Sequence, residues 1–287
     1  MPEGDTIFRA ARTLHRALAG KVVTRFDTAY APLARVHDDT PITGRTVDAV
    51  EAHGKHMVMR FSGDVTEPDA ALSRVWHGPL ALRTHMRMHG SWHIYRPGER
   101  WQRPPREMRV LVETADFVAV GFNVPDAEFE AARDVGARDA IARLGPDLLA
   151  PDFDAAEAVR RLRARGDMTI AEALLDQRAL AGIGNVFKSE VLFEGGVEPF
   201  ATVAAIAVDR LSALVDIARR QLAANVGGAS RGHGRRTTGR MAPAEGLWVY
   251  GRGGRPCRRC GTPIWFTRQG PGARPTYWCP RCQPASG

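Results

Sequence analysis

The chain has 287 residues, of which 44% are hydrophobic and 25% charged. This composition is typical of a folded globular protein and excludes a disordered one, and the length allows two domains of about 100–200 residues each. The formal net charge of +8 favours a polyanionic partner such as nucleic acid. A soluble basic protein without such a partner is the alternative that charge alone leaves open.

Residues 5–18 predict the first helix, because their apolar side chains recur at helical spacing up to Gly20. From residue 21 to about residue 130 the pattern changes to β-rich segments separated by Gly, Pro and Asp turns, such as HMVMRFSG and REMRVLVETADFVAVGF. No βαβ alternation is present. Residues 1–135 therefore predict an antiparallel β-sandwich or barrel with one leading helix.

The second half of the chain is expected to be mainly helical. Residues 136–151 predict a linker, and residues 152–246 a helical domain. Its expected helices are 152–165 with a cap at Asp152, 169–179, 185–195 and 202–224. Residues 226–246 are rich in Gly and Arg with little to bury, and predict a flexible loop. Residues 247–287 predict a small β-ribbon, which makes the fold class α+β.

No segment approaches the ~18 consecutive apolar residues of a membrane span. The first residues also lack the basic and apolar pattern of a secretory signal. The sequence thus predicts a cytoplasmic protein that does not enter a membrane.

All four cysteines lie in the last segment, as two Cys-x-x-Cys pairs: Cys257, Cys260, Cys279 and Cys282. In a cytoplasmic protein this clustering favours a metal site over a disulfide framework. Four thiolates can bind one Zn²⁺ tetrahedrally, and a site closed by four protein ligands is structural. A small β-ribbon of this kind has little core, so the metal would supply its folding energy.

One further stretch suggests a contact with an anion, and another places a lysine at a turn. The turn Ala181-Gly182-Ile183-Gly184 precedes Asn185 at the start of an expected helix, and N–H groups at a helix N-terminus bind anions. Lys55 follows Gly54 before a β-segment, which predicts the tip of a hairpin. An ordinary helical hairpin and a solvated lysine are the alternative interpretations.

Together, four stretches resemble the formamidopyrimidine-DNA glycosylase/endonuclease VIII family of base-excision repair enzymes. They are MPEGD at the start, GKHMVMRF around Lys55, LAGIGNVFKSEVLF around Asn185 and the ribbon ending in RPTYWCPRCQ. The resemblance spans nearly the whole chain. It implies a β-sandwich opened by a helix, a helix-two-turn-helix domain and a zinc finger. It also implies damaged double-stranded DNA as the partner, and we expect a monomer that acts at the bacterial nucleoid.

The resemblance implies that Pro2, exposed once Met1 is removed, is the nucleophile. An α-amino group has a pKa of about 7.7–8.0, so a useful fraction is neutral at physiological pH. Its attack on C1′ would give a Schiff base, and β- and δ-elimination would then cut the strand. Glu3 would be the general acid/base, and Lys55 would contact phosphate and assist base release.

The same resemblance implies DNA-binding residues. Asn185 and Arg274 would hold the phosphates that flank the flipped nucleotide, with Gly182 and Gly184 shaping the turn. The loop THMRMHGSW corresponds to the intercalating region of the family, which has to fill the gap left by the extruded base. This correspondence points to three residues of that loop, Arg87, Met88 and His89.

MPEGD and RPTYWCP resemble the endonuclease VIII branch more than the 8-oxoguanine enzymes, which usually open MPELPE. Oxidised pyrimidines and abasic sites are thus the expected substrates. Thr6 stands where the family commonly has a glutamate, and the two cysteine pairs are further apart than usual. The alternatives are an 8-oxoguanine/formamidopyrimidine-specific glycosylase and a zinc-ribbon DNA-binding protein without catalysis.

Overall fold

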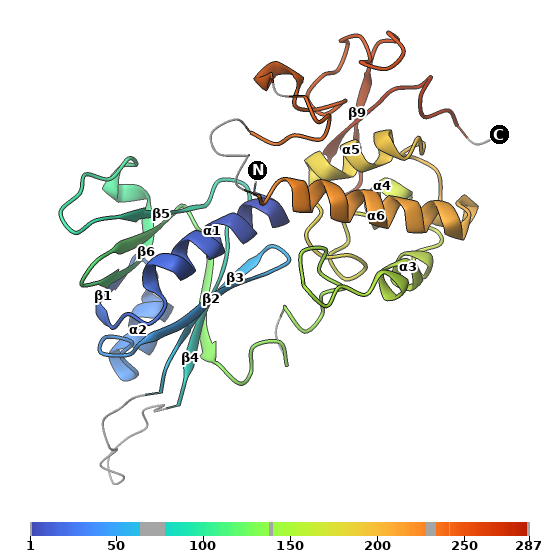
Figure 1. Cartoon of the computed structure of the whole chain (residues 1–287). Coiled ribbons are helices and arrows are strands. Elements are labelled where there is room, and N and C mark those ends of the chain that lie inside the picture. Colours follow the sequence, from blue (N-terminus) through green and yellow to red (C-terminus); the bar gives the residue numbers. More distant parts are fainter. Residues whose placement is uncertain (1, 64–77, 138–139, 228–233, 241, 286–287) are drawn as a thin grey trace. The chain divides into compact units, whose positions relative to one another are not determined.

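The computed structural model (Figure 1) describes most of the chain: residues 2–63, 78–137, 140–227, 234–240 and 242–285. The chain forms two compact units. One contains residue 2 and residues 6–143, and the other contains residues 3–5 together with residues 144–287. No helix in the described ranges is long and apolar enough to cross a membrane.

The first unit contains two four-stranded antiparallel sheets. Their strand orders are β1-β6-β7-β5 and β2-β3-β4-β8. The strands are β1 Val23–Thr28, β2 Val47–His53, β3 His56–Phe61, β4 Leu80–His85, β5 Ser91–Tyr95, β6 Met108–Thr114, β7 Val118–Phe122 and β8 Asp126–Ala131. A 3₁₀ turn, Pro105–Glu107, precedes β6.

The core of this unit joins the leading helix to both sheets. Helix α1, Gly4–Leu18, buries Leu14 and Leu18. The same cluster contains Phe61 from one sheet and Val112 from the other, so apolar side chains of both sheets share one interior. The structure confirms the predicted sandwich with a leading helix.

Two elements of the first unit were not predicted: helix α2 at Ala31–Asp39 and strand β8. Strand β8 alternates acidic residues with apolar ones, of which Ala127 and Phe129 pack against the core. It pairs with β4, where Glu130 lies 3.3 Å from the Arg83 guanidinium. The acidic residues of the strand thus lie beside a cation of the neighbouring strand, which its own sequence does not reveal.

The second unit has a helical part and a hairpin. The helices are α3 Ala155–Arg163, α4 Ile170–Ala173, α5 Asn185–Glu194 and α6 Val208–Ala224, with short 3₁₀ turns at Val203–Ala205 and Pro243–Glu245. Leu162, Phe187, Leu192 and Leu214 are fully buried in their shared core. The hairpin consists of β9 Trp265–Gln269 and β10 Arg274–Trp278, which confirms the predicted β-ribbon.

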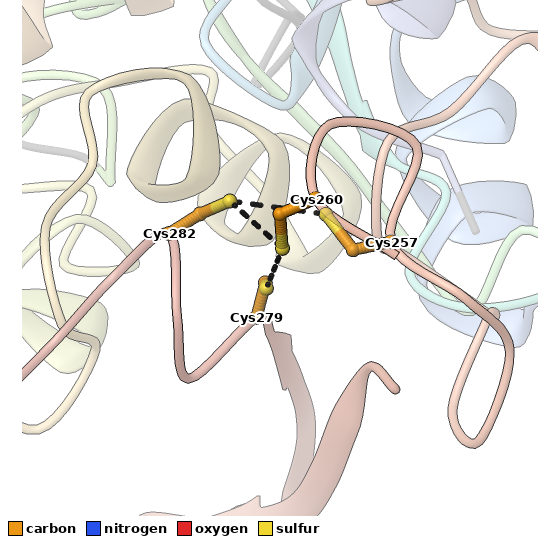
Figure 2. Close-up of side chains that lie close together, drawn as sticks. All are labelled: Cys257, Cys260, Cys279 and Cys282. Carbon is orange, nitrogen blue, oxygen red and sulfur yellow. Dashed lines mark hydrogen bonds between the residues drawn. The ribbon is translucent and has the colours of Figure 1, made fainter. Parts of the chain in front are cut away.

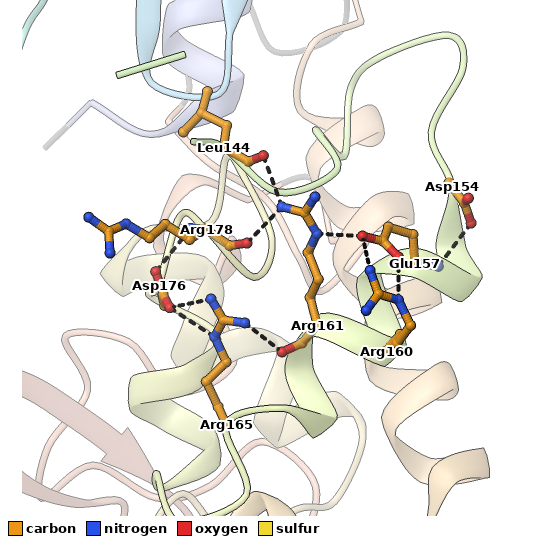
Figure 3. Close-up of polar contacts among 8 residues, drawn as sticks. All are labelled: Leu144, Asp154, Glu157, Arg160, Arg161, Arg165, Asp176 and Arg178. Atoms are coloured by element: carbon orange, nitrogen blue, oxygen red, sulfur yellow. Dashed lines mark hydrogen bonds and ion pairs between the residues drawn. The ribbon is translucent and has the colours of Figure 1, made fainter. Parts of the chain in front are cut away.

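Figure 3 shows the polar contacts that join the entry segment of this unit to the segment after α4. The Arg161 guanidinium donates to the carbonyls of Leu144 at 3.1 Å and Arg178 at 3.2 Å. Asp154, not Asp152, caps α3 by accepting from the Glu157 N–H at 2.9 Å. The predicted cap was wrong by two residues because the helix begins later than its apolar pattern suggested.

Two predicted helices are shorter than expected. The segment predicted as 169–179 is helical only up to Ala173; beyond it, Gln177 donates its side-chain N–H groups to the carbonyls of Leu175 and Ile183. Side-chain bonds of this kind compete with helix bonds. The segment predicted as 202–224 begins its α-helix at Val208, because earlier N–H groups donate outside the helix, such as that of Val203 to Met168.

Residues 226–246 were expected to form a flexible loop with little to bury. Residues 228–233 and 241 lie outside the described residues. In the described part, the Arg236 N–H donates to Asn225 Oδ1 at 2.8 Å, and Asn225 Nδ2 donates back to the Arg236 carbonyl at 2.7 Å. The Thr237 N–H donates to the Gly246 carbonyl at 2.8 Å. This part is therefore held by hydrogen bonds that the composition did not indicate.

Candidate functional site

The N-terminal residues differ sharply in burial. Pro2 is half-buried, whereas the next residue, Glu3, has 0% exposure. A buried carboxylate needs strong hydrogen bonds or an opposite charge to offset its lost hydration. Glu3 is therefore the residue around which the site is built.

The N-terminus of α5 binds the Glu3 carboxylate. Glu3 Oε2 accepts the N–H of Gly184 at 2.9 Å and that of Phe187 at 3.3 Å. Glu3 Oε1 accepts the Val186 N–H at 2.8 Å. The sequence predicted an anion site at this turn. The anion observed there is a carboxylate of the protein itself, so a DNA-binding role of Gly182 and Gly184 stays a prediction.

Glycine is required at two positions of the turn. A Cβ atom on Gly184 would lie 2.3 Å from the Cδ of Glu3, which no side chain can occupy without moving the carboxylate. Gly182 has a φ of +105° and accepts the Gly4 N–H on its carbonyl at 2.9 Å. The Gly182 N–H donates to Gln177 Oε1 at 3.1 Å. The turn thus fits closely around the first residues of the chain.

Helix α5 also holds strand β10. Asn185 Nδ2 donates to the Pro275 carbonyl at 2.8 Å, and Lys188 Nζ donates to Thr276 Oγ1 at 2.8 Å. Arg274, the residue before Pro275, is exposed. The structure therefore brings the two predicted phosphate ligands, Asn185 and Arg274, to the same place.

Lys188 was missed by the sequence analysis. Its side chain is 1% exposed, and burial lowers the pKa of Lys188 to about 8, with the charge of Arg274 acting in the same direction and that of Glu3 opposing it. A lysine in a helix is usually a solvated charge, so only the three-dimensional packing identifies it.

Glu190 was also missed. Its carboxylate accepts the N–H groups of Trp248 at 2.7 Å, Val249 at 2.9 Å and Tyr250 at 2.8 Å, and the hydroxyl of Thr237. Burial raises the pKa of the Glu190 carboxyl, and these hydrogen bonds oppose that shift. Glu190 therefore joins α5 to the segment that leads into the cysteine ribbon.

The cysteines form a compact cluster, which Figure 2 shows. Their four sulfur atoms all lie within 4.8 Å of one another, and none forms a disulfide. Tetrahedral ligation with Zn–S distances of about 2.3 Å places the sulfurs roughly 3.8 Å apart. The Cys257 and Cys282 sulfurs are 3.9 Å apart, and those of Cys260 and Cys279 are 3.5 Å apart. The residues fit a tetrahedral thiolate metal site.

Several arginines of the ribbon donate to backbone carbonyls of the same unit. Arg252 donates to the Pro256 carbonyl at 2.8 Å, Arg258 to the Ala244 carbonyl at 2.6 Å and Arg259 to the Phe193 carbonyl at 3.4 Å. These three guanidinium groups stabilise the fold around the cysteines. Fewer arginines of the ribbon are therefore available to bind a ligand than its composition suggests.

Lys55 lies on the predicted hairpin tip. Strands β2 and β3 pair up to His53 and His56, and Gly54 between them has a φ of +58°. Burial lowers the pKa of nearby His85 to about 4, and the charges of Arg87 and Lys55 act in the same direction. Lys55 thus lies near other cations of the sheet unit, and its contact with phosphate stays a prediction.

The turn after β4 carries Arg87, Met88 and His89, the residues predicted to fill the gap left by the extruded base. Met88 is 46% exposed, and His89 is also exposed. Arg87 has a φ of +48° and donates Nε to Asp126 Oδ2 at 2.6 Å. This ion pair fixes the turn at one side and leaves the apolar Met88 side chain on the surface.

Comparison with known proteins decides the family. Residues 1–137 match the formamidopyrimidine-DNA glycosylase N-terminal domain, and residues 144–233 match the formamidopyrimidine-DNA glycosylase H2TH domain. The chain belongs to the formamidopyrimidine-DNA glycosylase family. The resemblance seen in the sequence is thereby confirmed for both domains.

Relatives within the formamidopyrimidine-DNA glycosylase family extend over the whole chain. A protein of Streptomyces coelicolor named "Probable endonuclease 8 2" is 44% identical over 286 residues, covering 99% of this chain and 94% of the relative. "DNA-(apurinic or apyrimidinic site) lyase Nei2" of Mycolicibacterium smegmatis is 40% identical over 287 residues, covering 100% of both chains.

A solved structure, the Lactococcus lactis Fpg in complex with DNA containing an abasic site, matches with a TM-score of 0.79 and 21% identity. It covers 99% of this chain and 100% of the Fpg chain. At this identity the match is evidence for the fold. It agrees with the predicted sandwich, helical domain and terminal hairpin.

Proposed function

We propose that the protein is a bifunctional DNA glycosylase and abasic-site lyase of base-excision repair that acts through the amine of Pro2. The observation that carries this proposal is the Glu3 carboxylate. Glu3 directly follows Pro2 in the sequence, and three backbone N–H groups hold its carboxylate in place. A fixed carboxylate beside an α-amine supplies an acid/base group next to a nucleophile. Family membership and the names of the relatives support the same activity.

In the proposed reaction, Met1 is removed and the nitrogen of Pro2 attacks C1′ of the damaged nucleoside. The bond to the base breaks and the base leaves with the proton of the attacking amine. The bond between C1′ and the ring oxygen then breaks as that oxygen takes a proton, which opens the ring and leaves an iminium between C1′ and Pro2. Loss of a proton from C2′ expels the 3′ phosphate, and a second elimination expels the 5′ phosphate. Water then hydrolyses the iminium and regenerates the amine.

Glu3 has the right hydrogen bonds for the proton transfers. A carboxylate offers about four lone-pair positions, and three of them accept backbone N–H groups. The remaining position can take a proton and deliver it to the sugar ring oxygen as the ring opens. Because the N–H groups belong to a helix N-terminus, the carboxylate keeps its place while its charge changes.

We propose that DNA is held by residues from both units. Asn185, Lys55 and Arg274 bind phosphates, because cationic and amide donors fix the DNA backbone without reading its sequence. Arg87, Met88 and His89 fill the gap left by the flipped nucleotide. The exposure of Arg274 and Met88 supports these roles. Residues 152–246 and 247–287 act in this proposal as the DNA-binding domain and its zinc finger.

We propose zinc as the metal of the cysteine cluster, since four thiolates in a tetrahedral arrangement suit Zn²⁺. Cys257, Cys260, Cys279 and Cys282 would hold one ion, which would stabilise the hairpin that carries Arg274. Freshly purified protein should contain one zinc per chain, and thiol-specific chelation should release it with loss of DNA binding. A metal content well below one per chain would contradict this assignment.

The substrates we propose are oxidised pyrimidines and abasic sites in double-stranded DNA. The opening MPEGD and the names of the bacterial relatives, endonuclease 8 2 and Nei2 lyase, support this class. We also propose that the protein works as a monomer in the bacterial cytoplasm.

Borohydride trapping tests the proposed activity. Reduction in the presence of an abasic-site or thymine-glycol duplex should leave the protein covalently joined to DNA, and a Pro2→Gly variant should trap much less. A protein that binds the duplex but gives no adduct would instead be a zinc-ribbon DNA-binding protein. A matched lesion-free duplex serves as the control, since salt-dependent binding alone is common to both functions.

A further inference from the structure

Arg235 is a buried cation that pairs with an acidic residue of the N-terminal segment. Its side chain is 13% exposed. Nε donates to Asp5 Oδ2 at 3.0 Å and Nη2 donates to Asp5 Oδ1 at 2.8 Å, which is a bidentate contact. Asp5 itself has 0% exposure. The two residues are far apart in sequence, and neither was singled out from the sequence.

The same guanidinium faces Glu3. Arg235 Nη1 lies 3.8 Å from Glu3 Oε1, so one cation serves two carboxylates that are both fully buried. Buried like charges repel strongly and favour protonation of one of them unless a cation compensates. Arg235 is placed to compensate both.

The position of Arg235 is fixed from several sides. Its guanidinium carbon lies 5.4 Å from the ring centre of Phe187, the α5 residue whose N–H binds Glu3. The next residue, Arg236, is held by two hydrogen bonds with Asn225 at the end of α6. The hydroxyl of Thr237 donates to Glu190. A cation anchored in this way keeps its place when the charge on Glu3 changes.

We propose that Arg235 is a positioning residue for Glu3, which balances the two buried carboxylates so that Glu3 exchanges its proton with DNA and not with Asp5. The inference rests on the proposed function. Among the described residues, Lys188 also interacts electrostatically with Glu3, and Arg274 and Glu172 act on Lys188 in turn. Tyr250 is the titratable group that acts on Arg235 from the ribbon side.

Opposite pH shifts follow from this arrangement. Arg235→Gln removes the cation that faces both carboxylates, so the carboxyl-controlled limb of the pH–rate profile should move to higher pH. Asp5→Asn removes the neighbouring anion, so the same limb should move to lower pH. A charge within about 4–6 Å typically shifts a titration by about one to three pH units.

The experiment is single-turnover trapping on an abasic-site duplex from pH 5 to pH 9. Wild type, Arg235→Gln, Asp5→Asn and Arg235→Lys are compared with Arg240→Gln, whose side chain is 46% exposed and pairs with Glu245. The lysine variant keeps the charge and should restore the wild-type limb, whereas Arg240→Gln should leave it unchanged. Profiles that coincide for wild type, Arg235→Gln and Asp5→Asn would overturn the proposal.

Two readouts separate failure of this proposal from other failures. If wild type forms no adduct, the proposed function fails before Arg235 is tested. If Arg235→Gln does not fold, as judged by thermal unfolding, the decision passes to Asp5→Asn and Arg235→Lys. The proposal is supported if the carboxyl-controlled limb moves to lower pH in Asp5→Asn and stays at its wild-type position in Arg235→Lys. An Asp5→Asn profile that does not shift refutes it.

Discussion

Glu3 and Met88 represent two different ways of presenting a functional side chain. Glu3 has 0% exposure and is held by three backbone N–H groups, whereas Met88 is 46% exposed on a turn. A group that transfers protons gains from fixed geometry. A group that enters the DNA stack has to adapt to whatever base pair it meets. In the proposed function, the buried Glu3 provides preorganised chemistry and the exposed Met88 provides an adaptable contact with the lesion.

The largest effect is expected from a substitution at Gly184, which displaces the fixed Glu3 carboxylate. Gly184→Ala places a methyl group where the Glu3 carboxylate lies, so the carboxylate has to move and abasic-site cleavage should fall by about 10²–10⁴-fold. Single-turnover cleavage measures the effect. Gly166→Ala is the matched control, because its Cβ would have no neighbour closer than 3.7 Å; an equal loss there, or full activity of Gly184→Ala, would contradict the assigned role of the turn.

The burial of Lys188, on the fixed side of the comparison, can be tested through the pH dependence of stability. Burial lowers the pKa of Lys188 from 10.5 to about 8, so the folded protein releases this proton at a lower pH than the unfolded chain does. The cost of burying the charge is present below pH 8 and is relieved as the pH rises toward 10.5. Relative to Lys188→Met, wild type should therefore gain about 2–3 kcal/mol of stability over that range. Denaturant unfolding of both proteins at pH 7 and pH 10 measures it, and parallel pH dependence of the two would contradict the burial argument.

The smallest effect is expected on the adaptable side. Met88→Ala removes an exposed apolar group, so kcat/KM on a lesion duplex should fall by about three- to tenfold with no change in Tm, since exposed substitutions rarely alter stability. Val22→Ala, 50% exposed in the same unit, is the control. A loss of stability in Met88→Ala, or equal kinetics for Met88→Ala and Val22→Ala, would contradict a contact between Met88 and DNA.

The sequence predicted local features well. The apolar spacing of the first helix, the turn before Asn185, the hairpin tip at Lys55 and the paired cysteines are each encoded within a few consecutive residues. Such signals depend on periodicity and turn chemistry, and neighbouring residues suffice to specify them. Strand β8 shows the limit, because its sequence alternates acidic and apolar residues but does not reveal that it pairs with β4 beside Arg83.

The partners of the site residues could not be predicted. The Glu3 carboxylate and the Gly184 N–H are 181 positions apart, and Arg235 and Asp5 are 230 apart. Nothing in the sequence near Arg235 distinguishes it from Arg236 or from a solvated arginine. Only the packing of α5 against the first residues of the chain selects it.

The identity of the nucleophile is the central claim, and peptide mapping of the borohydride-trapped adduct tests it most directly. After nuclease and trypsin digestion, the reduced sugar fragment should be found on the peptide of residues 2–9, PEGDTIFR, with Met1 absent and the mass added at the Pro2 nitrogen. An adduct on any lysine-containing peptide, or trapping by protein that retains Met1, would contradict the account.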